Sequence, residues 1–194
     1  MEPNYSEIIQ KLQNTLDPYR FIHTMGVKDM CFSLALHYGY DERKAELAGL
    51  LHDVAKAYSS SENLIMARDL NIFLTEDEIR NPQLIHAKLG SFLAKRDYCV
   101  EDEEILQAII FHTTGKPDMN LLEKILYVSD YIEPSRCRID NLDIIRKIAF
   151  EDLDLAVFET ASATLEHLKS KNIEFDKKTL ETYEYYRELI NGRN

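Results

Sequence analysis

Apolar residues recur at helical spacing along almost the whole chain, and this periodicity is the feature that most constrains the fold. Ile105, Ala108 and Ile109, for example, fall on one face of a helix. No segment shows the alternation of polar and apolar residues that is typical of a half-buried strand. The sequence therefore predicts an all-α protein.

Helix start and stop signals divide this pattern into segments. We expect Ser6 to cap a first helix, which Asp17-Pro18 breaks, and a second helix over residues 19–38, which Gly39 ends. Asp41 opens a third helix, which we expect to reach Ala55. Further helical segments are predicted from about residue 62, over a short turn at 75–78, and over 82–96, 102–112, 121–132, 142–149, 152–170 and 177–190.

Length and charge limit the class of protein. The chain has 194 residues, which suits one domain with a substantial core, and no linker or repeat divides it, so we expect a single domain over residues 1–194. The formal net charge is −11, which disfavours a groove for polymeric DNA or RNA because such a groove needs clustered Lys and Arg. A small phosphate ligand stays open, because bound divalent cations can reverse the local sign of a site.

Cysteine usage and the N-terminal pattern predict a cytoplasmic location. Cys31, Cys99 and Cys137 are widely spaced and form no CxxC pair, which favours reduced thiols. The first residues lack the basic and apolar regions of a signal peptide. No apolar run approaches the roughly 20 residues of a membrane span, so we expect no membrane partner.

The adjacent residues His52 and Asp53 stand near the end of an apolar helix. Each buried polar side chain needs a partner, and one divalent metal ion satisfies both. Both can reach one ion only where the helix opens, and we expect residues 55–61 to allow this. The pair alone could also be adjacent by chance. His23 on the preceding helix and Asp130 in an otherwise apolar helix favour a metal site. A buried Asp is unfavourable unless it is paired or metal-bound.

Two further imidazoles, those of His86 and His112, are set among apolar residues of predicted helices. A set of imidazoles and carboxylates without thiolates accepts Fe, Mn, Co, Ni or Zn and does not select soft Cu(I). We therefore expect one or two divalent cations as the cofactor, with iron first and Mn, Co or Ni as alternatives.

The candidate ligands lie in short motifs, which in chain order are His23-Thr24-Met25-Gly26-Val27, Leu51-His52-Asp53-Val54-Ala55-Lys56, His86, His112-Thr113-Thr114-Gly115, and Asp130-Tyr131-Ile132-Glu133-Pro134 with Arg136. This ordered set resembles the HD-domain metal-dependent phosphohydrolases, and within them the YqeK-type symmetrical diadenosine tetraphosphate hydrolases. The resemblance implies a helical bundle of the HD-domain type. The site would occupy about residues 20–136, and the C-terminal helices over 141–190 would pack on it.

The resemblance also implies roles for individual residues. His23, His52, Asp53 and Asp130 would hold one metal ion. His86 and His112 have two open roles: they either ligate a second metal ion bridged by the Asp of the pair, or they contact phosphate, which is the role we favour.

Four residues near these ligands are candidates for phosphate binding. Lys56 lies one helical turn beyond the His-Asp pair, Arg20 lies one turn before the first ligand, and Arg136 follows the helix of the last ligand. Thr113 is a neutral donor. Fixed donors of this kind neutralise the charge that develops on phosphoryl oxygens, so we expect Lys56 to be catalytic together with Asp53. Each could instead be a surface residue or a helix cap.

The segment after the penultimate helix matches the place where the resembling family approaches its nucleotide. Its residues are Ile173, Glu174, Phe175 and Asp176. The remaining histidines, His37 and His167, are expected to have no functional role, because the first ends a helix and the second lies on the outer face of one.

The expected reaction is metal-dependent hydrolysis of dinucleoside polyphosphates, in which a metal-activated water cuts diadenosine tetraphosphate into two ADP. A nucleotidase or other phosphate-ester hydrolase on the same site is one alternative, because the HD scaffold hosts many reactions. A nucleotide-binding or partner-binding module without turnover is an alternative of another class. A homodimer formed through spare apolar faces is a further expectation.

Overall fold

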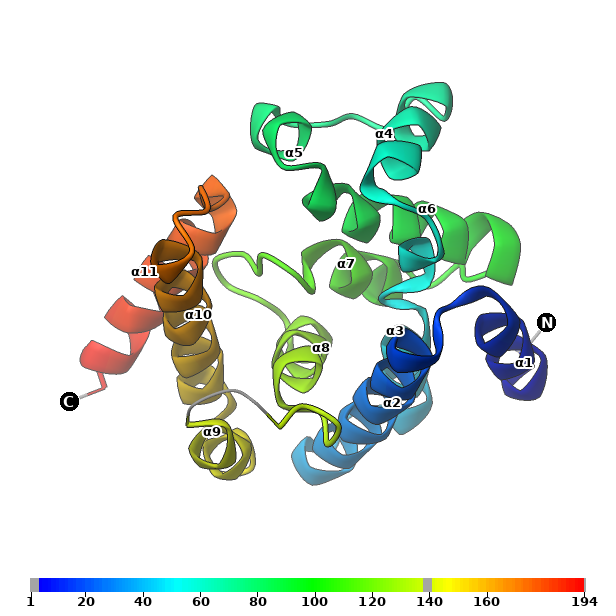
Figure 1. Ribbon diagram of the computed structural model, residues 1–194. Coiled ribbons are helices and arrows are strands. Elements are labelled where there is room, and N and C mark those ends of the chain that lie inside the picture. Colours follow the sequence, from blue (N-terminus) through cyan, green and yellow to red (C-terminus); the bar gives the residue numbers. More distant parts are fainter. Residues whose placement is uncertain (1–3, 138–140, 194) are drawn as a thin grey trace.

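The computed structural model describes residues 4–137 and 141–193, and over these residues the chain is built from helices with no strand (Figure 1). The all-α prediction is confirmed. The helices are α1 (Tyr5–Thr15), α2 (Pro18–Tyr38), α3 (Glu42–Leu51), α4 (Ser60–Asp69), α5 (Glu76–Arg80), α6 (Ile85–Tyr98), α7 (Glu103–Phe111), α8 (Leu121–Ile132), α9 (Leu142–Ala149), α10 (Leu153–Ser170) and α11 (Lys177–Asn191), with short 3₁₀ helices η1 (Val54–Ala57) and η2 (Pro82–Leu84).

Local capping groups set many of these boundaries. The Asp17 carboxylate accepts hydrogen bonds from two backbone N–H groups at the start of α2, and Asp41 accepts one at the start of α3. Gly39 ends α2 with a φ of 66°, a left-handed conformation that favours glycine. The short turn predicted at 75–78 begins α5, where the side chains of Thr75 and Glu78 form a capping box.

Two predicted helix starts were wrong. α1 begins before Ser6, because the side chain of Asn4 is the cap and accepts the backbone N–H of Glu7. Pro82 begins η2 rather than α6, which starts at Ile85. A residue before a proline is held away from the helical conformation, so the chain re-enters a helix through this tight turn.

The predicted extension of α3 to Ala55 was also wrong, and the error bears on the site. α3 ends at Leu51 with His52 as its C-terminal cap. Asp53 then leaves the helical path, with φ −108° and ψ 17°, before η1 begins. The helix therefore opens at the His-Asp pair itself rather than over residues 55–61, and this turns the two side chains toward a common space.

The buried helix α8 is the centre of the arrangement. Helices α2, α3, α7, α9 and α10 all pack against it (Figure 1). α2 and α3 form a tightly packed pair, α6 packs on α7, η1 and α4, and α11 packs on α10. One cluster of buried apolar side chains extends from Ile8 in α1 to Tyr186 in α11.

None of the helices in the described residues combines the length and apolar character that a bilayer crossing requires. All three cysteines are free, and Cys31 is buried in the core.

Because helices from distant parts of the chain pack against α8, their residues come together around it.

Candidate metal centre

The ligands predicted from the sequence converge at the ends of helices around α8. Five elements supply them: His23 from α2, His52 and Asp53 from the end of α3, His86 from α6, His112 from the end of α7, and Asp130 from α8. The four histidines and Asp53 are buried, while Asp130 is partly exposed. The site is thus assembled by tertiary packing, and no single helix contains it.

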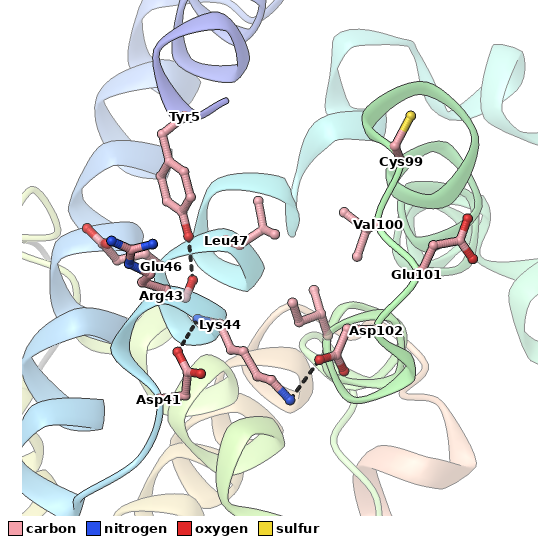
Figure 2. A pocket seen from close by; sticks show the side chains of 11 residues that line it. Tyr5, Asp41, Arg43, Lys44, Glu46, Leu47, Cys99, Val100, Glu101 and Asp102 are labelled. Atoms are coloured by element: carbon pink, nitrogen blue, oxygen red, sulfur yellow. Dashed lines mark hydrogen bonds and ion pairs between the residues drawn. The ribbon is translucent and has the colours of Figure 1, made fainter. Parts of the chain in front are cut away.

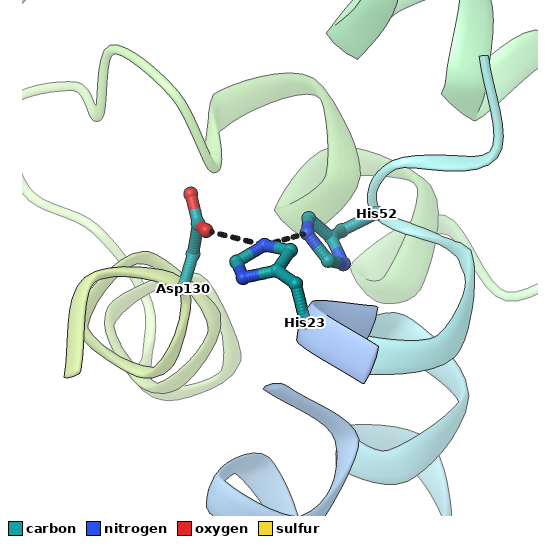
Figure 3. Close-up of side chains that lie close together, drawn as sticks. All are labelled: His23, His52 and Asp130. Atoms are coloured by element: carbon teal, nitrogen blue, oxygen red, sulfur yellow. Dashed lines mark hydrogen bonds and ion pairs between the residues drawn. The ribbon is translucent and has the colours of Figure 1, made fainter. Parts of the chain in front are cut away.

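One group of ligands consists of His23, His52 and Asp130 (Figure 3). The Nε2 atom of His23 lies 3.3 Å from Nε2 of His52 and 3.1 Å from Oδ1 of Asp130. Oδ2 of Asp53 lies 3.4 Å from Nε2 of His52 and 3.9 Å from Nε2 of His23. These four side chains offer two nitrogens and two carboxylates to one point.

A second group lies on the other side of Asp53. Nε2 of His86 and Nε2 of His112 are 3.1 Å apart. The second carboxylate oxygen of Asp53, Oδ1, lies 3.3 Å from the first of these nitrogens and 3.6 Å from the other. The Asp53 carboxylate therefore stands between the two groups, with one oxygen toward each.

The hydrogen bonds of the Nδ1 atoms decide which nitrogen each ring offers to the centre. Three of the rings donate Nδ1–H to the backbone carbonyl three residues earlier, at 2.5–2.7 Å: His52 to Gly49, His86 to Gln83 and His112 to Ile109. In a neutral ring this leaves a lone pair on Nε2. Lone pairs that face one another across about 3 Å cannot bond to each other, so this donor set fits a cation.

Two pKa shifts describe the protonation of the rings. Burial lowers the pKa of His23, but hydrogen bonds to Asp130 and Glu133 outweigh it and raise the pKa to about 9. Burial lowers the pKa of His86 to about 3, although Asp53 acts to raise it. At neutral pH without a metal ion, His23 therefore carries a proton that a cation would displace, while His86 is neutral.

The carboxylates are held in their anionic forms. Burial alone would raise the pKa of Asp53, but the neighbouring imidazoles, that of His52 first and then those of His112 and His86, hold it well below its usual range. Burial acts against Asp130 in the same way, and its hydrogen bond from His23 holds its pKa well below the usual range. Both acids are thus in the form that ligates a metal.

Both arginines predicted at the site contact its carboxylates. Nη1 of Arg20 donates to Oδ2 of Asp53 at 2.7 Å, and Nη2 of Arg136 donates to Oδ1 of Asp130 at 3.0 Å. Each guanidinium carries five N–H donors, so donors remain for a further anion. Among the described residues, nothing accepts a hydrogen bond from the buried Nε of Arg136.

Lys56 and Thr113 also lie at the centre. Burial lowers the pKa of Lys56, against the attraction of Asp53, because its ammonium group is partly removed from water. The Thr113 hydroxyl lies 3.1–3.2 Å from Nε2 of both His86 and His112. Lys56 thus places a positively charged side chain beside the candidate ligands, and Thr113 places a neutral hydrogen-bond donor there.

The predicted nucleotide segment lies further out. Its residues line one side of a cavity of about 220 Å³, and residues of α5, η2 and their connection line the other. The lining residues are Ile173, Glu174, Phe175, Asp176, Asp77, Arg80, Asn81 and Leu84. Asp176 also shares the wall of a smaller cavity, of about 30 Å³, with Thr113. Thr113 thus stands between this segment and the ligands.

A larger cavity, of about 810 Å³, lies elsewhere, between α1, α3 and the connection from α6 to α7 (Figure 2). Lys44 on its wall is engaged by Asp102 and Glu104, at 2.7 and 3.0 Å. None of the candidate ligands lines this cavity. Its volume therefore gives no information about the metal centre.

Glu133 is the site residue to which the sequence assigned no role. It is 1% exposed, and its Oε1 accepts the Nδ1–H of His23 at 3.1 Å. The available signals were its place directly after the helix of Asp130 and a glycine, Gly26, three residues after His23. Neither signal indicates the contact by itself, because the two partners lie 110 positions apart.

Comparison with known families gives a match to the HD domain over residues 20–135, a span that includes all the ligands. This chain belongs to the HD-domain family. The resemblance to HD-domain proteins predicted from the ordered histidines and aspartates is thereby confirmed. The matched span contains the adjacent pair His52 and Asp53.

Relatives of this HD domain align over nearly their whole length. Proteins named bis(5'-nucleosyl)-tetraphosphatase, symmetrical, are 39% identical over 190 residues in Bacillus subtilis (97% of this chain, 99% of that one) and 37% identical over 182 residues in Halalkalibacterium halodurans (93% and 95%). A crystal structure described as a predicted HD superfamily hydrolase involved in NAD metabolism, from Clostridium acetobutylicum, has a TM-score of 0.91 at 37% identity and covers 98% of both chains.

Proposed function

We propose that this protein hydrolyses diadenosine tetraphosphate symmetrically into two ADP, with divalent cations as cofactor. The observation that carries the proposal is the convergence of four Nε2 atoms and two aspartates, flanked by cationic side chains, in one HD domain. An HD fold alone does not select a substrate. The near-complete alignment with relatives named symmetrical tetraphosphatases favours this substrate over a general phosphate ester.

We propose two cation positions that share Asp53. His23, His52 and Asp130 would complete the first, and His86 and His112 the second. A phosphate contact by the last two histidines would need an N–H at Nε2. Each ring already holds its proton on Nδ1 against a backbone carbonyl, and the pKa of His86, about 3, keeps that ring neutral. This favours the second-metal role over the phosphate role.

Iron is the cation we propose first, with Mn, Co or Ni as alternatives. The donors are imidazole nitrogens and carboxylate oxygens without a thiolate, a borderline-to-hard set. A divalent cation in such a site lowers the pKa of water toward neutrality and stabilises negative charge on phosphoryl oxygens.

The basic side chains of the chain would bind and orient the polyphosphate. Lys56 is partly desolvated, so an incoming phosphoryl oxygen would provide the counter-charge that water no longer provides. The Nε of Arg136, from which no described residue accepts a hydrogen bond, and the remaining donors of Arg20 would hold further oxygens. Thr113 would add a neutral hydroxyl donor beside the second cation position.

The symmetrical outcome follows from which phosphorus is attacked. Water adds to a phosphorus next to the central bridging oxygen, the bond from that phosphorus to the bridge breaks, and the bridge oxygen leaves with one ADP. The water oxygen remains on the other ADP. The charge on the leaving oxygen must be neutralised by fixed donors, which is the role proposed for Lys56 and the arginines.

The segment Ile173, Glu174, Phe175 and Asp176 is proposed to contact the nucleoside end of the substrate. Its cavity adjoins Thr113 through Asp176, which supports a path from the ligands to this segment. We also propose that the chain acts as one HD domain over residues 1–194 in the cytoplasm. A homodimer stays a prediction, and light scattering after size-exclusion chromatography tests it.

Metal dependence is the test of this proposal. The protein is purified without chelator, its metal content is measured, and activity on diadenosine tetraphosphate is assayed before and after removal of metal with EDTA. Activity should vanish on removal, return with Fe²⁺, Mn²⁺, Co²⁺ or Ni²⁺, and be lost in Asp53→Ala. His37→Ala is the matched control, because His37 packs against Tyr38 and Phe150 and belongs to neither ligand group. Full activity in the metal-stripped protein, or faster cleavage of nucleoside monophosphates, would contradict the proposal.

A further inference from the structure

His23 differs from the other three histidines of the centre in what holds its ring. Those three donate Nδ1–H to backbone carbonyls, which the helices supply whatever the side chains are. His23 donates instead to the side chain of Glu133, at 3.1 Å. Its orientation therefore depends on one residue that lies on another element.

Glu133 is held in place by its own short network. The backbone N–H of Ser135 donates to Oε2 and the Ser135 hydroxyl donates to Oε1, both at 2.6 Å. The backbone carbonyl of Glu133 accepts from Nη2 of Arg146 at 2.9 Å. Ser135 thus holds both oxygens of the Glu133 carboxylate, and Arg146 holds the Glu133 backbone, independently of the contact with the imidazole.

Helix α2 leaves room for this carboxylate at Gly26. A Cβ atom at that position would overlap Oε2 of Glu133 and would lie 3.4 Å from Cδ of Pro134. Since Gly26 follows His23 by three residues, it lies on the same face of α2. The glycine therefore opens the gap through which Glu133 reaches the ring.

We infer that Glu133 is a positioning residue that sets the affinity of the cation position formed by His23, His52 and Asp130. Its carboxylate keeps the proton of His23 on Nδ1, directs the Nε2 lone pair to that position, and makes the ring a more basic ligand than one held by a carbonyl. The other cation position, at His86 and His112, does not depend on it. The inference rests on the proposed cation site.

The test compares Mn²⁺ binding to the full chain with and without the carboxylate. Glu133→Gln keeps the size of the side chain and a hydrogen-bond acceptor but removes the charge. Free Mn²⁺, measured by electron paramagnetic resonance during titration, should show that one class of site binds 10–100-fold more weakly, in the range typical for loss of such a partner. The remaining class should keep its wild-type affinity.

Glu123→Gln is the matched control for the removal of a buried carboxylate. Glu123 is 2% exposed, lies on α8, whose C-terminal cap is Glu133, and pairs with Lys116 at 3.1 Å, so its loss affects folding but not the candidate ligands. A second variant, Gly26→Ala, displaces the Glu133 carboxylate without removing any charge and should also weaken Mn²⁺ binding. Thermal unfolding in EDTA verifies that each variant is folded.

Unchanged Mn²⁺ affinity in Glu133→Gln, with wild-type binding intact, overturns the inference. Equal weakening in Glu123→Gln and Glu133→Gln also overturns it, because the effect would then come from general destabilisation. Wild-type protein that binds no Mn²⁺ would overturn the proposed metal site itself, a result distinct from the other two.

Discussion

At the scale of single residues, the site is governed by which nitrogen of each histidine holds the proton. Carbonyls fix Nδ1–H on His52, His86 and His112, so Nε2 of each ring stays free for a cation. Asp53 can then serve both groups, because its Oδ2 lies near Nε2 of His52 and its Oδ1 lies near Nε2 of His86. The local bonds of the backbone thereby prepare the ligands before any cation arrives.

The number of bound cations should follow from this arrangement. The wild-type chain is expected to bind two Mn²⁺, and His86→Ala or His112→Ala should bind one, because each removes a ligand of the second position only. Equilibrium dialysis with metal analysis measures the ratio. His167→Ala, which lies outside both ligand groups, should still bind two. Two ions retained in both His86→Ala and His112→Ala would refute the second position.

The pH dependence of binding should reflect the proton on His23. Because the pKa of this ring is raised to about 9, the proton is present at neutral pH and a cation must displace it. The apparent Kd for Mn²⁺ should therefore fall, by about tenfold per pH unit, as the pH rises from 7 toward 9, since one proton is released per ion. Titrations at pH 7.0, 7.5, 8.0 and 8.5 measure the slope. A flat profile would mean that His23 binds no cation.

The sequence could single out the candidate ligands that the fold brings together, because each lies in a short motif whose chemistry is visible locally. His52 and Asp53 are adjacent, and Asp130 stands out in an apolar helix. Glu133 could not be assigned, because its role depends on contact with His23 across the fold. The same limit explains why sequence alone left the roles of His86 and His112 open.

At the scale of the elements, the geometry of the candidate site depends mainly on where helices end. α3 stops at Leu51, so that His52 and Asp53 turn toward α8 instead of continuing around the helix. Helix starts with a side-chain cap nearby, such as Asp17 and Asp41, were predictable because the capping bonds are local. The end of α3 was not, because no Gly or Pro marks it in the sequence.

The C-terminal end of α8 is secured by α9. Nε of Arg146 donates to the carbonyl of Ile132 at 2.9 Å, and Nη2 donates to the carbonyls of Glu133 and Arg136 at 2.9 and 3.0 Å. The Ile132 carbonyl lies in the last turn of α8, where carbonyls lack an intrahelical partner, and the other two lie in the segment that follows, so one guanidinium ties the end of α8 to that segment. Helix α9 thereby holds the loop that carries Glu133 and Arg136.

Loss of this guanidinium should therefore loosen the fold. Arg146→Met keeps most of the side-chain volume and should lower the free energy of unfolding by about 2 kcal/mol, the range for hydrogen bonds to a charged group. Urea unfolding of the metal-free protein measures it. Lys147→Met, at the neighbouring exposed position, should change stability by less than about 0.5 kcal/mol. Equal effects of the two variants would remove the role given to Arg146.

At the scale of the whole molecule, the proposed metal centre can form only when the core is folded. Its candidate ligands come from α2, α3, α6, α7 and α8, and α8 is surrounded by the other helices that pack on it. An unfolded chain holds these residues far apart. Cation binding and folding should therefore be coupled.

This coupling predicts a thermal shift. Each Mn²⁺ position, at about 100 times its Kd, should stabilise the metal-free protein by about 2.7 kcal/mol, because the ion binds the folded state alone. For a chain of this length each occupied position should raise the melting temperature by about 5–10 °C. Circular dichroism melts with and without Mn²⁺ measure the shift, and Asp53→Ala should abolish most of it. A melting temperature that does not change on addition of Mn²⁺ would contradict a metal site assembled by the fold.

The products formed from diadenosine tetraphosphate test the central claim most directly. Metal-loaded protein is incubated with this substrate, and the nucleotides are separated and quantified by chromatography at early times. The account predicts two ADP for each substrate consumed, with no accumulation of ATP or AMP. Equal amounts of ATP and AMP would place the cleavage at an outer bridge and contradict the symmetrical mechanism, and no cleavage by the metal-loaded protein would contradict the substrate itself.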